Sequence, residues 1–262
     1  MFQINFAYTC FIPILKCLPT TMKLTFAATL LALVGGILLS FGVKSRYRAV
    51  NIIFSILNSF LKGIPILVFL YVFNDSVDDI MTWLSYAFGF AYDIRHSPTF
   101  AFAVLAMALS YAPYMCDMIT SAYDTIPKGQ REACEAFGFT QWQMMRRILI
   151  PQMTVIALPN FGNHFVNLLK ATSLTCMVTI MEMMGAARNF ATLNQRFLET
   201  YSVCALLYWG VFLIFEQVFR ILEKKTGRYL GTALAAKRRR RKLFRMTKAS
   251  DEELGQGERV KA

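Results

Sequence analysis

Long uncharged, apolar runs constrain this chain more than any other feature of its sequence. The clearest run, 24–43, lies between Lys23 and Lys44 and contains no charged residue. A helix needs about 20 mostly apolar residues to cross the hydrocarbon core of a bilayer. Of all residues 56% are hydrophobic, whereas an ordinary soluble domain is about 45–50% apolar. We therefore expect an all-α, polytopic membrane protein.

About five transmembrane helices are expected, at 24–43, 50–73, 97–117, 149–169 and 200–219. The block containing the second span is longer than one crossing requires, so its first half is expected to lie partly at the interface. Lys62 interrupts this block, and we expect its ammonium group to reach the cytoplasmic headgroups. Residues 1–18 are predicted to be an extracytoplasmic or interfacial segment, 19–222 the transmembrane domain and 223–262 a basic cytoplasmic tail.

Positive charge sets the expected orientation, because cytoplasmic loops collect Lys and Arg. Of the 28 Lys and Arg residues, 14 lie between Arg220 and the C-terminus, with a basic run at 237–242. Five crossings then place the N-terminus outside and the C-terminus in the cytoplasm. The net charge is +12, but no nucleic-acid-binding motif accompanies it. We expect the tail to contact solvent or lipid phosphates and expect no nucleic-acid partner.

The sequence offers little for catalysis or metal binding. The six cysteines are scattered without a C-x-x-C pair, and the chain has only two histidines. Neither a zinc site nor a catalytic cluster is therefore expected. A membrane-embedded enzyme is disfavoured on this ground. A secondary transporter or a channel subunit for a small polar solute stays open as the alternative function.

A polar stretch of more than 20 residues, from Asp124 to Pro151, separates the third and fourth spans. Loops this long in compact proteins are usually functional. Pro127 suits the first turn of a helix and Gly138 its end. Thr140 followed by Gln143 fits the pattern of a capping box that opens a second helix. We predict two short helices joined by a glycine turn on the cytoplasmic face, a shape able to dock into a partner.

The fourth span carries polar residues at helical spacing. Asn160, Asn163, Asn167 and Lys170 recur at intervals of three and four residues, with His164 beside them. A helix would place them along one face. Polar groups inside a span face the bundle or a wet cavity, because exposing them to lipid is costly. The asparagines could line a solute path or hold helices together by hydrogen bonds; for Lys170 we favour the path.

Several motifs, taken in order, resemble a known family. The run Glu132-Ala133-Cys134, then Gly138, then Ile-Leu-Ile-Pro at 148–151, is similar to the E-A-A-x3-G-x9-I-x-L-P loop of binding-protein-dependent ABC importer permeases. Residues 62–65 resemble the family's R-G-T-P. Segments 128–133, 157–163 and 168–174 resemble the branch for polar amino acids such as His, Gln, Glu, Arg or cystine. Ala171 stands where that branch has Asp. The resemblance covers nearly the whole chain, and the fold it implies is the type I ABC importer transmembrane fold.

The resemblance implies a permease subunit that imports a polar amino acid and has no catalytic residue or cofactor of its own. In that family the loop docks into the ATPase, which carries this role over to Gln130, Glu132, Ala133, Cys134, Gly138, Ile148 and Pro151. The expected solute path comprises Asn160, Asn163, His164, Asn167, Lys170, Thr172 and Ser173. The chain has no G-x4-G-K-[ST] loop, so ATP and Mg²⁺ are expected on a partner. Implied partners are two ATP-binding subunits, a second permease subunit (identical or homologous), an extracytoplasmic solute-binding protein and membrane lipid, in the inner membrane of a bacterium.

Overall fold

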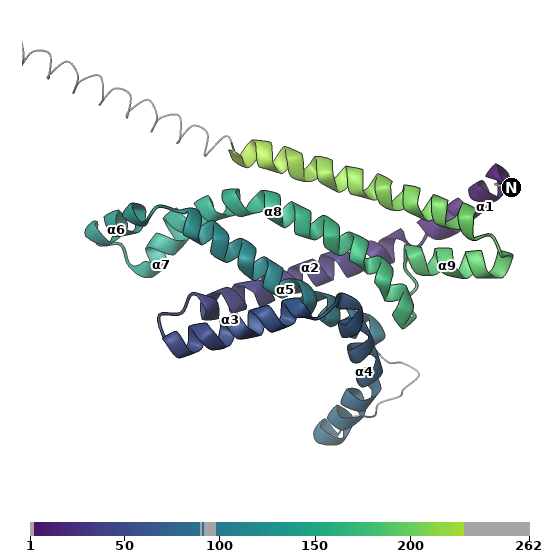
Figure 1. Ribbon diagram of the computed structural model, residues 1–262, viewed down its shortest axis with the longest axis horizontal. Helices are drawn as coiled ribbons and strands as arrows, with labels where there is room; N and C mark the ends of the chain where they lie inside the picture. Colours follow the sequence, from purple (N-terminus) through teal and green to yellow (C-terminus); the bar gives the residue numbers. More distant parts are fainter. Residues whose placement is uncertain (1–2, 90, 92–97, 228–262) are drawn as a thin grey trace, which may run out of the picture.

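A computed structural model describes residues 3–89, 91 and 98–227. Every element in these ranges is a helix, which confirms the all-α expectation. Most of the helices run along the long axis of an elongated bundle, whereas α4 leaves the bundle at a steep angle (Figure 1). The basic run at 237–242 and the rest of the chain from residue 228 lie outside the described residues.

Three described helices are long and apolar enough to cross a membrane: α2 (Leu18–Val43), α5 (Thr99–Thr125) and the last helix, Phe197–Gly227. Two bent pairs raise the number to as many as five if each pair counts as one span. One pair joins α3 (Arg48–Gly63) to α4 (Ile66–Phe88), and the other joins the helices within 141–178 to α9 (Met183–Asn194). The exact number of crossings therefore stays a prediction.

The expected span at 50–73 is not one straight helix. α3 ends at Gly63 and α4 begins at Ile66, with a bend of 93° between them. The cause is local, because Pro65 has no N–H to donate and disfavours the helical conformation in the residue before it. Ile64 accordingly has extended backbone angles. The bend turns the second half of this apolar block away from the direction of the first.

A close contact joins α2 to α5. A Cβ atom added at Gly36 of α2 would lie 2.5 Å from the Cβ of Met115 and 2.9 Å from the backbone nitrogen of Cys116, both in α5. Only glycine therefore permits this approach. Helices in a bilayer associate mainly through van der Waals packing, and small residues let their backbones come close.

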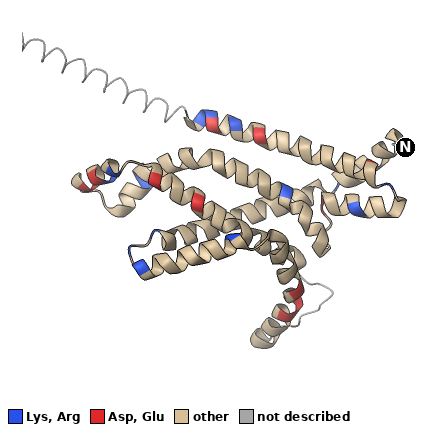
Figure 2. Ribbon diagram, viewed as in Figure 1, with Lys and Arg blue, Asp and Glu red and all other residues tan. Residues whose placement is uncertain are grey.

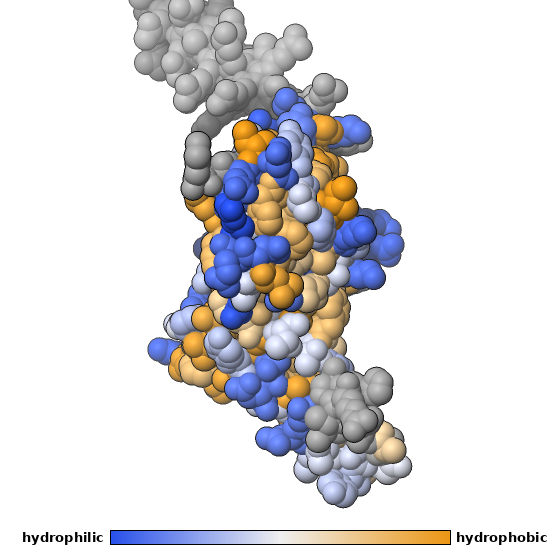
Figure 3. All heavy atoms as spheres, turned by 90° about the vertical axis from the view of Figure 1, so that its right-hand side faces the viewer, coloured by the Kyte–Doolittle hydropathy of each residue, from blue (hydrophilic) through white to orange (hydrophobic). Residues whose placement is uncertain are grey.

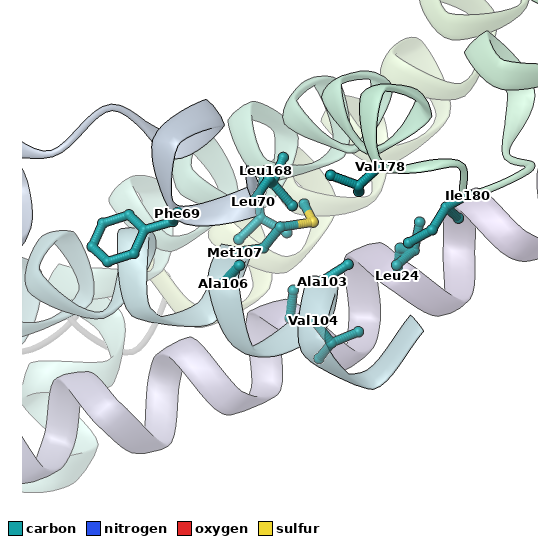
Figure 4. Packing of buried hydrophobic residues seen from close by; sticks show 11 residues of the cluster. Leu24, Phe69, Leu70, Ala103, Val104, Ala106, Met107, Leu168, Val178 and Ile180 are labelled. Carbon is teal, nitrogen blue, oxygen red and sulfur yellow. The ribbon is translucent and has the colours of Figure 1, made fainter. Parts of the chain in front are cut away.

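The largest cluster of buried apolar residues lies where α2, α4, α5, α8 (Ile150–Ala171) and the segment after α8 meet (Figure 4). Met107 of α5 lies at its centre, near Leu70 of α4 and Leu168 of α8. The 3₁₀ helix η3 (Thr172–Val178) continues α8 and contributes Val178. The core thus fixes α8 against the pair formed by α2 and α5.

A second cluster closes the end of the bundle that bears the N-terminus. α1 (Ile4–Leu15) contributes Cys10 and Ile14, α9 contributes Met183 and Ala187, and the last helix contributes Val203 and Cys204. Viewed from this end, much of the surface is hydrophilic, with hydrophobic patches between the hydrophilic areas (Figure 3). This end therefore presents both hydrophilic and hydrophobic groups.

We predict that Gly36→Ala destabilises the subunit, since the added methyl group meets Met115 and the backbone of α5. Overpacking of this kind typically costs about 1–3 kcal/mol. The matched control is Gly210→Ala in the last helix, where an added Cβ meets nothing within 4 Å. Thermal unfolding of the purified variants, followed by gel filtration with fluorescence detection, measures the difference. Equal unfolding temperatures for the two variants would contradict the packing argument.

Candidate functional site

The polar loop folds as two short helices joined at Gly138. The first, α6, covers Lys128–Ala136, and the second, α7, covers Gln141–Met144. Gly138 has a φ of +74°, a left-handed conformation that favours glycine. The Thr140 hydroxyl accepts the N–H of Gln143, and the Gln143 side chain accepts the N–H of Thr140, which confirms the predicted capping box.

The loop presents a mixed surface at its tip. Glu132 and Ala133 are exposed on α6, whereas Cys134 is buried against Ile126, Met144 and Leu149. Two aromatic residues that sequence reasoning missed flank the glycine turn: Phe137 is 83% exposed and Trp142 68%. Large aromatic side chains are typical anchors of protein interfaces. Their position on either side of the predicted turn could have indicated from the sequence that both side chains are exposed.

Hydrogen bonds fasten α6 to two long helices. Nη1 of Arg131 donates to the Tyr123 hydroxyl of α5 at 2.8 Å, and the guanidinium lies 4.5 Å from the centre of the Tyr123 ring. Nε2 of Gln152 in α8 donates to Oε1 of Gln130 at 3.0 Å. A π-helical turn, η2 (Met145–Leu149), holds half-buried Ile148 and leads directly into α8, where Pro151 stands in the first turn. α6 is therefore attached directly to both α5 and α8.

The polar residues of α8 form a continuous exposed stripe, which we call the polar face: Asn160, Asn163, Asn167 and Lys170. The opposite side of the same helix is buried by apolar residues such as Phe165 and Leu169. The polar face is thus left uncovered by the described helices of this chain. His164 is half-buried beside it, with its ring centre 6.0 Å from that of Tyr114 in α5.

Two predicted path residues follow α8 into η3. Ser173 is half-buried and donates to the carbonyl of Lys170 at 2.8 Å. Thr172 is fully buried and donates to the carbonyl of Leu169 at 2.7 Å. The structure therefore keeps Ser173 close to the polar face but turns Thr172 inward, because consecutive helical residues point in different directions.

A cavity of about 320 Å³ lies at the Lys170 end of the polar face. We call it the Lys170 cavity, and it is lined by Lys170, Ser173, Met184, Tyr201, Cys204, Ala205 and Tyr208. The ammonium group of Lys170 lies 4.9 Å from the centre of the Phe212 ring, a cation–π contact. Most of this lining comes from the last helix and was missed from the sequence. The available signal was weak: Tyr201 and Tyr208 are seven residues apart and so share a helical face.

A buried carboxylate stands behind the Lys170 cavity. Glu182 is 0% exposed and accepts hydrogen bonds from the Tyr208 hydroxyl at 2.5 Å and from the N–H of Gly185 at 2.9 Å. The Thr21 hydroxyl of α2 donates at 3.3 Å to Oε2, the oxygen that also accepts from Tyr208, whereas Gly185 donates to Oε1. Glu182 therefore ties together α2, the start of α9 and the last helix, and it fixes the orientation of Tyr208.

A further group of polar residues, the Asp117 cluster, joins α3 to α5. Lys62 forms an ion pair with one carboxylate oxygen of Asp117, and Nδ2 of Asn58 donates to the other at 3.0 Å. Lys62 was expected to reach the headgroups; the structure gives it a carboxylate partner and leaves that expectation a prediction. An opposite charge within reach lowers the cost of an ionised group inside a membrane helix. Other charged residues gather on α6 and the helix ends around it, with further ones on α4, on α9 and along the end of the last helix (Figure 2).

Comparison with known proteins agrees with this arrangement. The family model "Binding-protein-dependent transport system inner membrane component" matches residues 23–228. Among curated proteins, the probable amino-acid permease protein YxeN of Bacillus subtilis is 28% identical over 84% of this chain and 94% of its own length. The L-cystine transport system permease protein TcyL of the same species is 31% identical, over 82% and 88%. The histidine/lysine/arginine/ornithine transport system permease protein HisQ of Escherichia coli is 26% identical, over 78% and 89%.

The fold also matches a solved structure. The crystal structure of an amino acid ABC transporter with histidines gives a TM-score of 0.72 at 23% identity, covering 86% of this chain and 99% of that one. The family model spans more than half of the chain. The chain therefore belongs to the inner-membrane components of binding-protein-dependent transport systems, as a multi-pass permease subunit of an ABC importer whose ATPase is a separate subunit and which works with a binding protein.

Proposed function

We propose that this subunit imports a polar amino acid, or a close relative such as cystine, across the cytoplasmic membrane. The observation that carries the proposal is a physical continuity. The two-helix loop is fastened to α8 through Gln130 and Gln152, and α8 bears the polar face. Motion of the loop would therefore move the residues best suited to contact a polar solute. Relatives of similar length are named as amino-acid, cystine or histidine permeases.

The chemistry of the polar face favours an amino acid. Asparagine side chains offer both donors and acceptors, so they suit a solute that carries both kinds of group. Lys170 offers a positive charge at the Lys170 cavity, where a carboxylate would bind. The volume of about 320 Å³ is sufficient for a free amino acid. Keeping a lysine in a span costs about 2.5–3.5 kcal/mol at its centre, and binding a carboxylate explains why this cost is tolerated.

The proposed assembly contains two permease subunits, this chain and an identical or homologous partner, with two ATP-binding subunits that hold ATP and Mg²⁺. Glu132, Phe137 and Trp142 would meet the ATPase, because they form the exposed surface of the loop. The second permease would pack toward the polar face, which the described helices of this chain leave open. The N-terminus would then lie outside and the C-terminus in the cytoplasm, since the loop has to face the ATPase.

Transport would follow from a two-state equilibrium of the assembly. Closure of the ATPase subunits on ATP would pull the loops and favour the state open to the binding protein, and hydrolysis would restore the state open to the cytoplasm. ATP shifts this equilibrium only by its differential affinity for the two states. The bonds of Arg131 and Gln130 to α5 and α8 are the contacts through which that difference would reach the membrane helices.

Uptake by reconstituted vesicles tests the function. The permease, its ATPase and its binding protein are reconstituted, and uptake of labelled polar amino acids is measured with ATP or with a non-hydrolysable analogue inside. We expect uptake that requires both ATP hydrolysis and the binding protein. Uptake driven by an ion gradient without ATP would favour a secondary transporter and contradict the proposal.

We predict that Gly138→Val uncouples ATP hydrolysis from uptake, because a β-branched residue is strained at a φ of +74° and the two loop helices can no longer keep their angle. Uptake should fall at least tenfold while ATP hydrolysis continues. Gly129→Val is the control, since Gly129 lies in helical conformation in the same loop and an added Cβ meets nothing within 4 Å. Wild-type uptake by the Gly138 variant would show that this loop does not couple ATP hydrolysis to uptake.

We also predict that Lys170→Ala reduces uptake far more than it reduces assembly. If the charge of Lys170 only destabilised the membrane helix, removing it would stabilise the subunit and leave uptake intact. Lys23→Ala is the control, because Lys23 is an exposed lysine on α2. Uptake and the amount of assembled complex are measured in the same vesicles. Full uptake with unchanged or increased assembly would refute the role of Lys170.

A further inference from the structure

We infer that the Asp117 cluster is a binding site for the head group of a zwitterionic α-amino acid, with the ammonium group on Asp117 and Asn58 and the carboxylate on Lys62. The inference rests on the proposed function and extends it to three residues, none of which belongs to the expected path. It assigns a second solute site, distinct from the Lys170 cavity.

The position of the cluster places it beside the polar face. Asp117 lies three residues after Tyr114 on α5, so both side chains share one side of that helix. The Tyr114 ring centre lies 6.0 Å from that of His164, which stands next to Asn160 and Asn163 on α8. Asp117 thus lies about one helical turn along α5 from the Tyr114 ring that contacts His164.

The cluster is partly exposed and is incompletely satisfied. The side chain of Asp117 is 53% exposed and that of Lys62 is 29% exposed, so both charges are accessible. Asn58 is only 7% exposed, and within the part of the chain that the structure describes its Oδ1 has no hydrogen-bond partner. Its Nδ2 is already used by Asp117. An unsatisfied buried acceptor is costly, so a donor that reaches Oδ1 of Asn58 would be favoured.

The head group of an amino acid supplies such a donor. An ammonium group has three donors, and the acceptors available here are a carboxylate oxygen of Asp117 and Oδ1 of Asn58. Releasing Lys62 from Asp117 would leave its charge uncompensated, but the solute's own carboxylate takes the place of Asp117. The ion pair between Lys62 and Asp117 is thus replaced by two ion pairs with the solute. No charge is left unpaired in a medium where an unpaired charge is costly.

The site differs from the Lys170 cavity in what it recognises. Among the described residues, the lining of the Lys170 cavity contains one cation and no carboxylate, so it favours binding of the solute's carboxylate group. The Asp117 cluster presents both a positive and a negative charge. It would hold the ammonium and the carboxylate group of the solute and leave the solute's side chain free. It therefore takes α-amino acids as a class, whichever side chain they carry.

The test uses the full complex reconstituted with its ATPase and binding protein. The variants are Asp117→Asn, Lys62→Met and the double variant that carries both changes. The matched control is Lys44→Met with Asp124→Asn, since Lys44 and Asp124 form the corresponding ion pair between α2 and the end of α5. We expect each cluster variant to lower uptake per assembled complex at least tenfold, while ATP hydrolysis stimulated by the loaded binding protein changes less than twofold. The control pair should change both by less than twofold.

The double variant separates solute binding from a purely structural role. It leaves no unpaired charge in the membrane, so it assembles even where a single variant fails. A structural ion pair predicts that the double variant regains wild-type uptake, whereas a solute site predicts that uptake stays at least tenfold lower. Wild-type uptake by the double variant, or a parallel loss of uptake and stimulated ATP hydrolysis, overturns the inference. Failure of the wild-type complex to import any amino acid would instead refute the proposed function.

Discussion

The cost of a polar group that faces hydrocarbon governs the organisation of this subunit. Each polar side chain in a span has to meet protein or water, and the structure shows three outcomes. Glu182 is fully enclosed and satisfied by donors from three helices. Lys62 and Asp117 neutralise each other at an accessible position. The asparagines of α8 stay uncovered. Burial thus separates the carboxylate that holds the bundle together from the polar groups that the described helices leave exposed.

Packing explains why those groups stay in place. Gly36 lets α2 approach α5 closely, and the cluster around Met107 fixes α8 against both. The last helix has few buried residues within its apolar window. It nevertheless supplies Tyr208 and Phe212, whose positions are set by Glu182 and Lys170 respectively. The rigid elements therefore carry the polar face, and a more loosely packed element completes the Lys170 cavity.

Features that depend on local sequence could be predicted, and those that depend on distant contacts could not. The capping box at Thr140 and the turn at Gly138 follow from residues within a few positions of each other, and the structure contains both. The bend at Pro65 was not predicted, because hydropathy gives the length of an apolar block and not the direction of its helices. The pairing of Lys62 with Asp117 and the contact of Lys170 with Phe212 join residues more than 40 positions apart, so no local pattern announces them. Glu182 was overlooked because it follows directly after an apolar stretch.

The π-helical turn η2 has a consequence for the direction in which α8 points. A π turn contains one residue more than the α-helical turn it replaces, and each residue of an α-helix advances the helix by about 100° around its axis. The five residues 145–149 therefore set the rotational phase between the loop and every side chain of α8. In a regular helix of the same length, Asn163 and Lys170 would be rotated toward the flank now occupied by their neighbours. A single surplus residue before α8 thus decides which side of this 22-residue helix turns away from the core.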